Sequence, residues 1–528
     1  MNVFTLHDVQ TGLKFLREIS SFLHHPVSSR EARATLRTRF ENRDSDFLAL
    51  MRRAVYENPE SPYLALLKNA GCRYGDLRGE VARQGLEAAL RKLFQEGVFL
   101  TVNEFKGRLP VRRGNLVVKA GLSLLRNPLA GHHLRAHTSG TAGKNVPVLI
   151  DLAYVRDRAV NHRLALEARC GVQWSHAVWG IPGNTDMVRV LELCALDAPP
   201  ERWFSQVDPR SPRLHPRYRW SARFMRWAGQ VWGVPLPAPE YVPLSDPKPI
   251  VDWLARTADR KKTAHIVTWA SPAVRLCQAA LGAGQDLSHV QFSIGGEPVT
   301  AAKLATIRRT GATAVPRFMA MECGYIAYGC LKPSYPDELH VFDDMLMVIQ
   351  PGDEGSEHGL PPQALLLTSL RPTAPFILLN VSLGDQAESV AGLCGCPLEN
   401  LGWTKRLRQV RSFEKLTSGG MTFLDTDILN ILEVDLPERF GGTGLDYQLV
   451  ELEDAEGVPK LKLVISPSLG PRDPGLVKEF FLETIGAGSG AARAMSLQWR
   501  DADCLSVERS YPLLAPSGKI IHFLKKRP

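Results

Sequence analysis

The chain has 528 residues, with 64 lysines and arginines against 55 aspartates and glutamates, so its net charge is +9. Its hydrophobic content of 44% and charged content of 23% are those of an ordinary globular protein. They argue against collagen, an intrinsically disordered chain and a disulfide-dense secreted scaffold. At roughly 150 residues per domain, the length predicts about three or four structural units, each able to bury a core.

The N-terminal segment does not look like a signal peptide, because it has no unbroken apolar region and carries acidic residues among its basic ones. No stretch of about 18 uncharged apolar residues occurs, so we expect a cytoplasmic protein without a transmembrane helix or a membrane partner. The nine cysteines are then expected to be thiols or metal ligands. The modest positive charge suits an anionic ligand such as a nucleotide, and we predict no binding to nucleic acid because no basic stripe carries interleaved aromatic residues.

Residues 1–105 are predicted to be helical. The segments 47–51, 63–67 and 86–99 carry apolar residues at mixed three- and four-residue spacings, which is the period of a helix with one buried face.

From about residue 134 the pattern changes to short β-rich runs that alternate with helical ones. Residues 146–150 and 154–168 are the first such pair, and the alternation predicts an α/β fold. A proline-rich excursion over 197–247 interrupts this pattern. Its aromatic residues are expected either to line a pocket or to pack the excursion onto the core.

A last unit is expected from residue 411 to residue 528. Residues 447–452 and 461–465 alternate around a polar turn, which predicts a β-hairpin. Residues 474–485 are predicted to form an amphipathic helix, with Asp473 as its cap and Pro474 in its first turn.

The segment 137–144 has the strongest chemical character in the chain. Two glycines let its backbone turn tightly, and three hydroxyls and a lysine surround the turn, which suits a polyphosphate. It is not a Walker A loop, because its glycines are too close together and Asn145 stands where a serine or threonine should hold magnesium. Composition alone would equally fit an ordinary turn before a strand.

The order of residues from Thr138 to Lys144 resembles the phosphate loop of the adenylate-forming superfamily, which includes acyl-CoA synthetases, peptide-synthetase adenylation domains and luciferases. Further segments resemble the other motifs of that superfamily, in the same order. They are Gly295–Pro298, Glu322 in 318–322, Gly384–Asp385, Arg411–Ser412 with Gly420, and Pro516–Lys519. Because the turn at 295–298 is similar to the adenine-binding turn of the phenylacetate–CoA ligase branch, the chain is identified as a member of that branch.

The resemblance implies that the chain binds ATP. Its phosphates would lie against Thr138, Ser139, Gly140, Thr141, Gly143 and Lys144, and its adenine against Gly295, Gly296, Glu297 and Pro298. Asp385 would accept hydrogen bonds from the ribose hydroxyls, and Arg411 would mark the hinge into a small C-terminal domain. A plain turn at Asp385 is the alternative.

Three residues are implied to be catalytic, namely Lys519, Glu322 and Thr141. Lys519 would bridge the attacking carboxylate and the α-phosphate, and Glu322 would hold magnesium directly or through water. Lys519 could also be a solvated tail lysine. Met319 and Met321 replace the glycine and threonine that normally precede the glutamate, and Phe413–Glu414 stands where two aspartates are frequent. These departures concern transfer to a thiol more than nucleotide binding.

Cys330, His340, Cys394 and Cys396 form a possible metal site. Three thiolates and an imidazole suit tetrahedral zinc, and similar residues in the phenylacetate–CoA ligase branch imply a structural zinc ion. The alternative is four unrelated buried residues, and Cys323 is a further thiol that could replace one ligand. Trp269, Phe292 and Phe318 lie in segments that border the acyl pocket in the family, which favours an aromatic or apolar acid, although core packing explains them equally well.

Taken together, the sequence predicts an α/β enzyme with a large multi-layer N-terminal domain of sheets and helices, over 1–408, and a small mobile α+β lid, over 411–528. It would activate a carboxylic acid as an acyl-adenylate and pass the acyl group to a thiol, with CoA preferred. One alternative is transfer to a carrier protein, an amine or another acceptor; another is a nucleotide-binding protein that has lost catalysis. A homodimer is left open.

Overall fold

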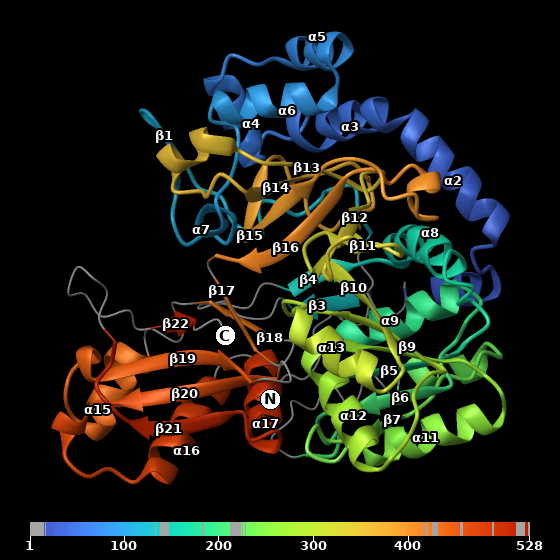
Figure 1. Cartoon of the computed structure of the whole chain (residues 1–528). Coiled ribbons are helices and arrows are strands. Elements are labelled where there is room, and N and C mark those ends of the chain that lie inside the picture. Colours follow the sequence, from blue (N-terminus) through green and yellow to red (C-terminus); the bar gives the residue numbers. More distant parts are fainter. Residues whose placement is uncertain are drawn as a thin grey trace.

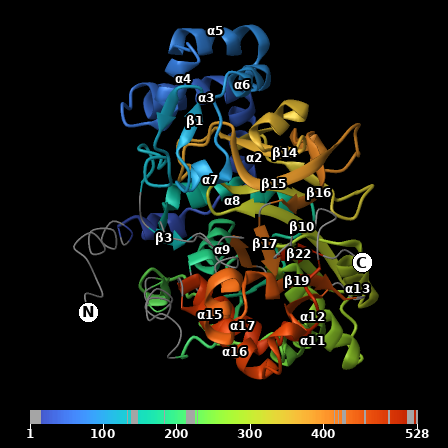
Figure 2. The same cartoon turned by 90° about the vertical axis from the view of Figure 1, so that its left-hand side faces the viewer.

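The computed structural model of the chain is shown in Figure 1 and, turned by 90°, in Figure 2. It describes residues 15, 17–131, 134–137, 147–181, 184–211, 223, 225–227, 229–413, 415–418, 421–424, 431–454, 458–487, 490–513 and 523–525.

Helices fill the described part of 1–105. They are α2 (Ser29–Glu41), α3 (Arg43–Met51), a π-helix (Arg52–Tyr56), α4 (Pro62–Asn69), α5 (Tyr74–Gln84), α6 (Leu86–Gln95) and α7 (Val102–Phe105). Helix α6 is shorter than the predicted 86–99, because Gly97 has a φ of 84° and turns the chain out of the helix. In both figures α3 to α6 lie at one end of the molecule, and α6 packs on strand β13 (Leu346–Ile349).

A twelve-stranded sheet forms the centre of the molecule, in the order β13-β14-β15-β16-β12-β11-β10-β9-β8-β5-β6-β7. Beyond β13, its strands are β14 (Ala364–Ser369), β15 (Val381–Val390), β16 (Arg406–Ser412), β12 (Leu339–Val341), β11 (Gly324–Gly329), β10 (Thr313–Ala320), β9 (Val290–Gly295), β8 (Ala264–Trp269), β5 (Ser175–Gly180), β6 (Arg202–Ser205) and β7 (Pro239–Tyr241). From β10 to β7 neighbouring strands are parallel, and from β13 to β10 they are antiparallel.

Helices cover both faces of the parallel strands, as a parallel sheet requires. Val178 and Trp203 point to the core that contains α8 (Leu152–Glu167) and α9 (Asn184–Ala195). Their neighbours Trp179 and Phe204 point to the opposite core, with α11 (Lys248–Asp259), α12 (Ala270–Gly282) and α13 (Ala301–Arg309). This period of two, with a helix layer on each side, confirms the predicted α/β class.

The proline-rich segment 197–247 does more than cover the fold, since it supplies β6 and β7 at one edge of the sheet. Trp203 and Phe204 on β6 are buried on opposite faces, so packing rather than a pocket explains these two aromatic residues. The strands have only four and three residues, which is too short for a period of two to be visible in the sequence.

The chain after β16 forms a smaller unit at the other end of the molecule from α3 to α6 (Figures 1 and 2). Its elements are β17 (Lys415–Ser418), β18 (Met421–Leu424), a π-helix (Ile431–Asp435), α15 (Leu436–Phe440), β19 (Tyr447–Glu453), β20 (Pro459–Ile465), α16 (Pro474–Gly486), α17 (Gly490–Asp501), β21 (Leu505–Arg509) and β22 (Phe523–Lys525). The antiparallel pair β19–β20 is the predicted hairpin, and the Asp473 side chain caps α16 as predicted.

Two short hairpins complete the fold, β1 (Val111–Arg113) with β2 (Leu116–Val118) and β3 (Leu134–His137) with β4 (Pro147–Ile150). None of the described helices is both long enough and apolar enough to cross a membrane.

Candidate active site and metal centre

The predicted phosphate loop and the predicted mobile lysine lie outside the described residues. This concerns Thr138, Ser139, Gly140, Thr141, Gly143, Lys144 and Lys519. The strands on either side of the loop are described and pair with each other, His137 opposite Pro147. The roles of these seven residues therefore stay predictions.

The predicted adenine-binding turn at 295–298 follows β9. A side chain at Gly295 would place its Cβ 2.5 Å from the carbonyl oxygen of Arg317, and Gly296 has a φ of 74°, so both positions need glycine. Glu297 is buried, and its carboxylate accepts hydrogen bonds from the backbone N–H (3.1 Å) and the hydroxyl of Ser271. Because Ser271 lies in the first turn of α12, the Glu297 carboxylate caps that helix.

Glu322, the predicted magnesium ligand, lies in the turn between β10 and β11. One of its carboxylate oxygens pairs with Nζ of Lys106 at 2.5 Å, and both side chains are less than a tenth exposed. Sequence reasoning missed Lys106, because the two residues are 216 positions apart and no motif contains the lysine.

The turns that carry Gly295 and Glu322 lie side by side. Strands β9 and β10 are parallel neighbours, with Gly295 opposite Arg317, and both turns follow the carboxyl ends of these strands. Ligands of open α/β sheets bind at this edge. The structure thus brings two of the predicted nucleotide segments together.

Asp385 and the predicted hinge residue Arg411 lie on neighbouring strands, β15 and β16. Asp385 stands opposite Ser412, and the carbonyl of Gly384 accepts hydrogen bonds from the Ser412 hydroxyl (3.0 Å) and the Phe413 N–H (2.9 Å). Arg411 pairs with Asp337 at 3.2 Å. Helix α7 packs against β15, and Lys106 directly after it reaches Glu322, so α7 links the strand of Asp385 to the turn of Glu322.

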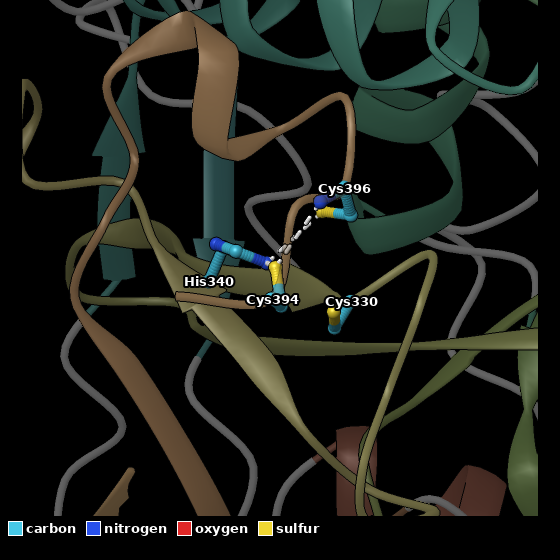
Figure 3. Close-up of side chains that lie close together, drawn as sticks. All are labelled: Cys330, His340, Cys394 and Cys396. Carbon is cyan, nitrogen blue, oxygen red and sulfur yellow. Dashed lines mark hydrogen bonds between the residues drawn. The ribbon is translucent and has the colours of Figure 1, made fainter. Parts of the chain in front are cut away.

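The four predicted zinc ligands converge, as Figure 3 shows. Cys330 follows β11, His340 lies on β12, and Cys394 and Cys396 lie in the loop between β15 and β16. The ligand atoms all lie within 4.8 Å of one another. Cys323 is not part of this cluster; it lies in the turn beside Glu322.

The distances in the cluster fit one tetrahedral ion. Nε2 of His340 lies 3.5 Å from Sγ of Cys394 and 3.3 Å from Sγ of Cys396. Bonds of about 2.3 Å to sulfur and about 2.0 Å to nitrogen, at tetrahedral angles, place such ligand pairs about 3.5 Å apart.

Backbone and side-chain contacts hold the four candidate metal ligands in place and set the tautomer of His340. Nδ1 of His340 lies 2.5 Å from the carbonyl of Trp403, to which it donates, so Nε2 is the ring nitrogen with a lone pair. Burial lowers the pKa of His340, which favours the neutral ring. The Glu399 carboxylate accepts hydrogen bonds from the N–H groups of Cys394 (3.2 Å) and Gly395 (2.8 Å) and so fixes the loop.

The predicted walls of an acyl pocket are distributed over the parallel strands. Phe292 is fully buried in the core with α11 to α13, so it packs that core. Trp269 ends β8 and carries the guanidinium of Arg189 over its ring, 5.5 Å from the centroid. Phe318, on β10, is partly exposed. Charged residues on α9 such as Arg189 were missed, because a single arginine inside a helical pattern carries no motif.

No protein-family profile matches the sequence, and no curated protein matches it either. Among solved structures, the chain is similar to a 2-hydroxyisobutyryl-CoA ligase in complex with 2-HIB-AMP and CoA, with a TM-score of 0.50 and 14% identity over 95% of this chain and 91% of the ligase.

Two further likenesses have lower TM-scores. One is to an o-succinylbenzoate CoA synthetase from Bacillus subtilis, with a TM-score of 0.42 and 15% identity over 75% of this chain and 69% of the synthetase. The other is to an amide bond synthetase from Marinactinospora thermotolerans, with a TM-score of 0.42 and 12% identity over 90% of this chain and 92% of that one. The phenylacetate–CoA ligase branch stays a prediction. The chain shares the fold of the 2-hydroxyisobutyryl-CoA ligase, with a large N-terminal domain and a small C-terminal domain.

Proposed function

We propose that the protein activates a carboxylic acid with ATP and transfers the acyl group to the thiol of CoA. A carboxylate oxygen attacks the α-phosphorus of ATP, the bond from this phosphorus to the bridging oxygen breaks, and pyrophosphate leaves. The thiolate sulfur then attacks the acyl carbon of the adenylate, and AMP leaves as the carbon–oxygen bond breaks. The acid has an apolar or aromatic body.

One observation carries this proposal. The chain has the fold of an acyl-CoA ligase, and the turns of Gly295–Pro298 and Glu322 follow the carboxyl ends of neighbouring parallel strands, the edge at which open α/β sheets bind their ligands. Asp385 lies on a strand that α7 connects to this edge. The order TSGTAGK at 138–144 and the tail lysine Lys519 supply, by resemblance, the remaining phosphate contacts.

Magnesium is part of the proposal, with Glu322 as its carboxylate ligand. A hard cation takes oxygen ligands, and the buried carboxylate is of the required type. The ammonium of Lys106 stands against this carboxylate in the structure and supplies positive charge at the same place. Zinc is also proposed, at the cluster of Cys330, His340, Cys394 and Cys396. Four protein ligands leave no position for a substrate, so its role would be structural.

The decisive assay measures pyrophosphate release with a panel of aromatic, aliphatic and amino acids, with and without CoA. Lys519→Ala is expected to lower acid-dependent release by 100-fold or more while ATP binding, measured by calorimetry, stays within about threefold, because the lysine stabilises charge that develops in the transition state. Lys525→Ala, in the same tail, is the matched control and should retain the release rate. Undiminished release by Lys519→Ala would contradict the assignment.

A second acceptor is also a candidate. Phe413–Glu414 departs from the usual hinge, and lid rotation is the step that admits the acyl acceptor. Acid-dependent pyrophosphate release without consumption of CoA would therefore favour a carrier protein or an amine as the acceptor.

A further inference from the structure

A group of buried charges lies on the face of the parallel strands that α8 and α9 cover. Helix α9 contributes Asp186, Arg189 and Glu192, whose three-residue spacing places them on one face. Arg158 comes from α8 and Arg317 from β10. All five side chains are less than a tenth exposed, and we refer to them as the arginine cluster.

Two of the three arginines in the cluster have a carboxylate partner. Nη2 of Arg158 lies 3.2 Å from Glu192, and Nη1 of Arg189 lies 3.0 Å from Asp186. Arg317 instead donates to the hydroxyl of Tyr325 (3.0 Å) and the carbonyl of Ser293 (3.1 Å). In the part of the chain that the structure describes, no carboxylate lies within ion-pair distance of Arg317. The cluster therefore carries more positive than negative charge.

Several donors in and beside the cluster lack an acceptor. Within the described ranges, Nε of Arg158, Arg189 and Arg317 and the hydroxyl of Tyr154 are buried without a hydrogen-bond partner. A buried donor without an acceptor lowers the stability of the fold, and a buried guanidinium without a charge partner lowers it more. An anion in the cluster would supply acceptors to these donors and would balance the charge of Arg317, which has no carboxylate partner among the described residues.

These donors belong to one neighbourhood. Arg158 and Arg317 flank the ring of Tyr325, with Cζ atoms 4.8 Å and 5.8 Å from its centroid. A Cβ built on Gly324 would touch the Tyr154 hydroxyl and would lie 3.2 Å from Nε of Arg158. Burial, and then the charge of Arg317, lowers the pKa of Arg189, so these two guanidinium groups repel each other across the cluster.

The cluster borders the proposed nucleotide site. Arg317 stands opposite Gly295, and Gly324 lies two residues after Glu322. A Cβ on Gly180, the last residue of β5, would lie 2.5 Å from the Asp186 carboxylate. The cluster thus lies at the carboxyl ends of the parallel strands, where a ligand that extends from the nucleotide site would enter the fold.

We infer that the arginine cluster binds a second carboxylate of the acid substrate, at the end opposite to the carboxylate that is activated. The inference rests on the proposed function. The activated carboxylate has to meet the phosphates of ATP, so it cannot also occupy a buried cluster that borders the nucleotide site from inside the core. Guanidinium groups pair well with carboxylates because their N–H groups match both oxygens. The predicted apolar or aromatic body would connect the two ends.

The test compares dicarboxylic acids of graded length, aliphatic and aromatic, each with its monomethyl ester, which keeps the length and removes one charge. Acid-dependent pyrophosphate release should be at least 100-fold faster, as kcat/KM, with the best diacid than with its monoester. If none of the acids in the panel stimulates pyrophosphate release, the proposed function is contradicted. If the monoesters stimulate release with the same kcat/KM as the diacids, only the inference of a second carboxylate is overturned.

Variants of Arg317 test whether the preference for diacids over monoesters depends on the arginine cluster. Arg317→Met should remove at least 100-fold of kcat/KM for the diacid and leave the monoester within threefold, and Arg317→Lys should recover part of the loss. Arg39→Met is the matched control, since Arg39 is a buried arginine paired with Asp157 and Asp344, neither of which belongs to the cluster. It should lower stability without changing the preference for diacids.

Binding to the wild-type protein provides a readout that does not depend on the variants folding. The best diacid should raise the thermal unfolding temperature in the presence of a non-hydrolysable ATP analogue, and its monoester should not. An equal shift with both, or an unchanged diacid preference in Arg317→Met, would overturn the inference.

Discussion

The ion pair between Lys106 and Glu322 gives the predicted magnesium ligand a structural partner. Removing one member of a buried pair leaves the other charge poorly compensated, which costs about 3–5 kcal/mol. Lys106→Met should therefore lower the apparent Tm by several degrees. In the double variant Lys106→Met/Glu322→Gln most of this loss should be recovered, because no uncompensated carboxylate is left.

Measurements of pyrophosphate release distinguish the role of Glu322 from that of Lys106. Glu322→Gln should lower pyrophosphate release and raise the magnesium concentration needed for half-maximal rate, since a carboxylate oxygen is lost. Arg83→Met is a suitable control for general effects of charge removal, because its pair with Glu80 is exposed on the arginine side. Equal Tm losses in the single and double variants would contradict a coupled pair.

At the level of single residues, the order of the motifs in the sequence identified candidate site residues. The sequence did not reveal which charged side chains contact one another. Glu322, Asp385 and the four metal ligands were named from the sequence, because each type of side chain suits one ligand in a recognisable context. Lys106 and Arg317 were missed, because their significance lies in contacts to residues far away in the chain or in the absence of a carboxylate partner. No local pattern records either condition.

At the level of elements, the cysteine and histidine cluster connects the end of β11, β12 and the loop between β15 and β16. If zinc is bound there, these segments depend on it, because metal binding contributes directly to folding free energy. Cys396→Ser should abolish stoichiometric zinc in elemental analysis and lower the apparent Tm. Cys277→Ser, at a buried thiol outside the cluster, should retain zinc. Purified wild-type protein without stoichiometric metal would contradict the proposed zinc site.

Two buried histidines on the neighbouring strands β5 and β8 predict that the stability of the fold decreases in acid. His176 and His265 are Cα partners on these strands, and their Nδ1 atoms lie 2.8 Å apart. Burial lowers the pKa of His176 to about 4, and burial also lowers the pKa of His265 well below its usual value. The unfolded chain binds these protons near pH 6.5, so their contribution to stability is present above pH 6.5 and is lost as the pH falls towards 4.

The apparent Tm should therefore drop between pH 6.5 and pH 4.5, and His176→Asn should make this drop shallower. Asp343 acts in the opposite sense, because burial raises its pKa to about 7 and favours the folded state at low pH. The comparison of wild type and His176→Asn at each pH separates the histidine contribution from that of Asp343. Parallel pH profiles of the two proteins would contradict the prediction.

Elements with strong local signals were predicted well. Helix α16 has a capping aspartate and a proline in its first turn, and its predicted start at residue 474 is the observed one. The predicted start of α8, residue 154, lies two residues after the observed start at Leu152. The end of α6 and the strands β6 and β7 were missed. The first depends on a single glycine, and the others owe their structure to the edge of the sheet that they join.

At the level of the whole molecule, the small C-terminal domain is docked on the large one in one orientation. The Asp501 carboxylate accepts hydrogen bonds from the N–H of Leu244 (3.0 Å) and the hydroxyl of Ser245 (3.2 Å). Arg275 donates to the carbonyl of Ala502 at 3.1 Å. These contacts hold a domain that, under the proposed function, has to rotate between adenylation and thioester formation.

Weakening the docking should change the balance between the two half-reactions. Asp501→Ala removes two hydrogen bonds of about 1 kcal/mol each, so it should shift the population of this orientation by roughly 5- to 30-fold. The ratio of the adenylation rate to the rate of thioester formation, measured in single-turnover experiments, should change by at least fivefold. The half-reaction that uses the docked orientation should slow, and the other should be unaffected or faster.

Glu479→Ala is the matched control, because Glu479 pairs with Arg500 inside the C-terminal domain. It removes the same charge and should leave the ratio of rates unchanged. A uniform loss of both half-reactions in Asp501→Ala would mean that the contact only stabilises the fold. An unchanged ratio at unchanged stability would mean that this orientation is not on the reaction path, and only a selective change in one half-reaction supports a rotating lid.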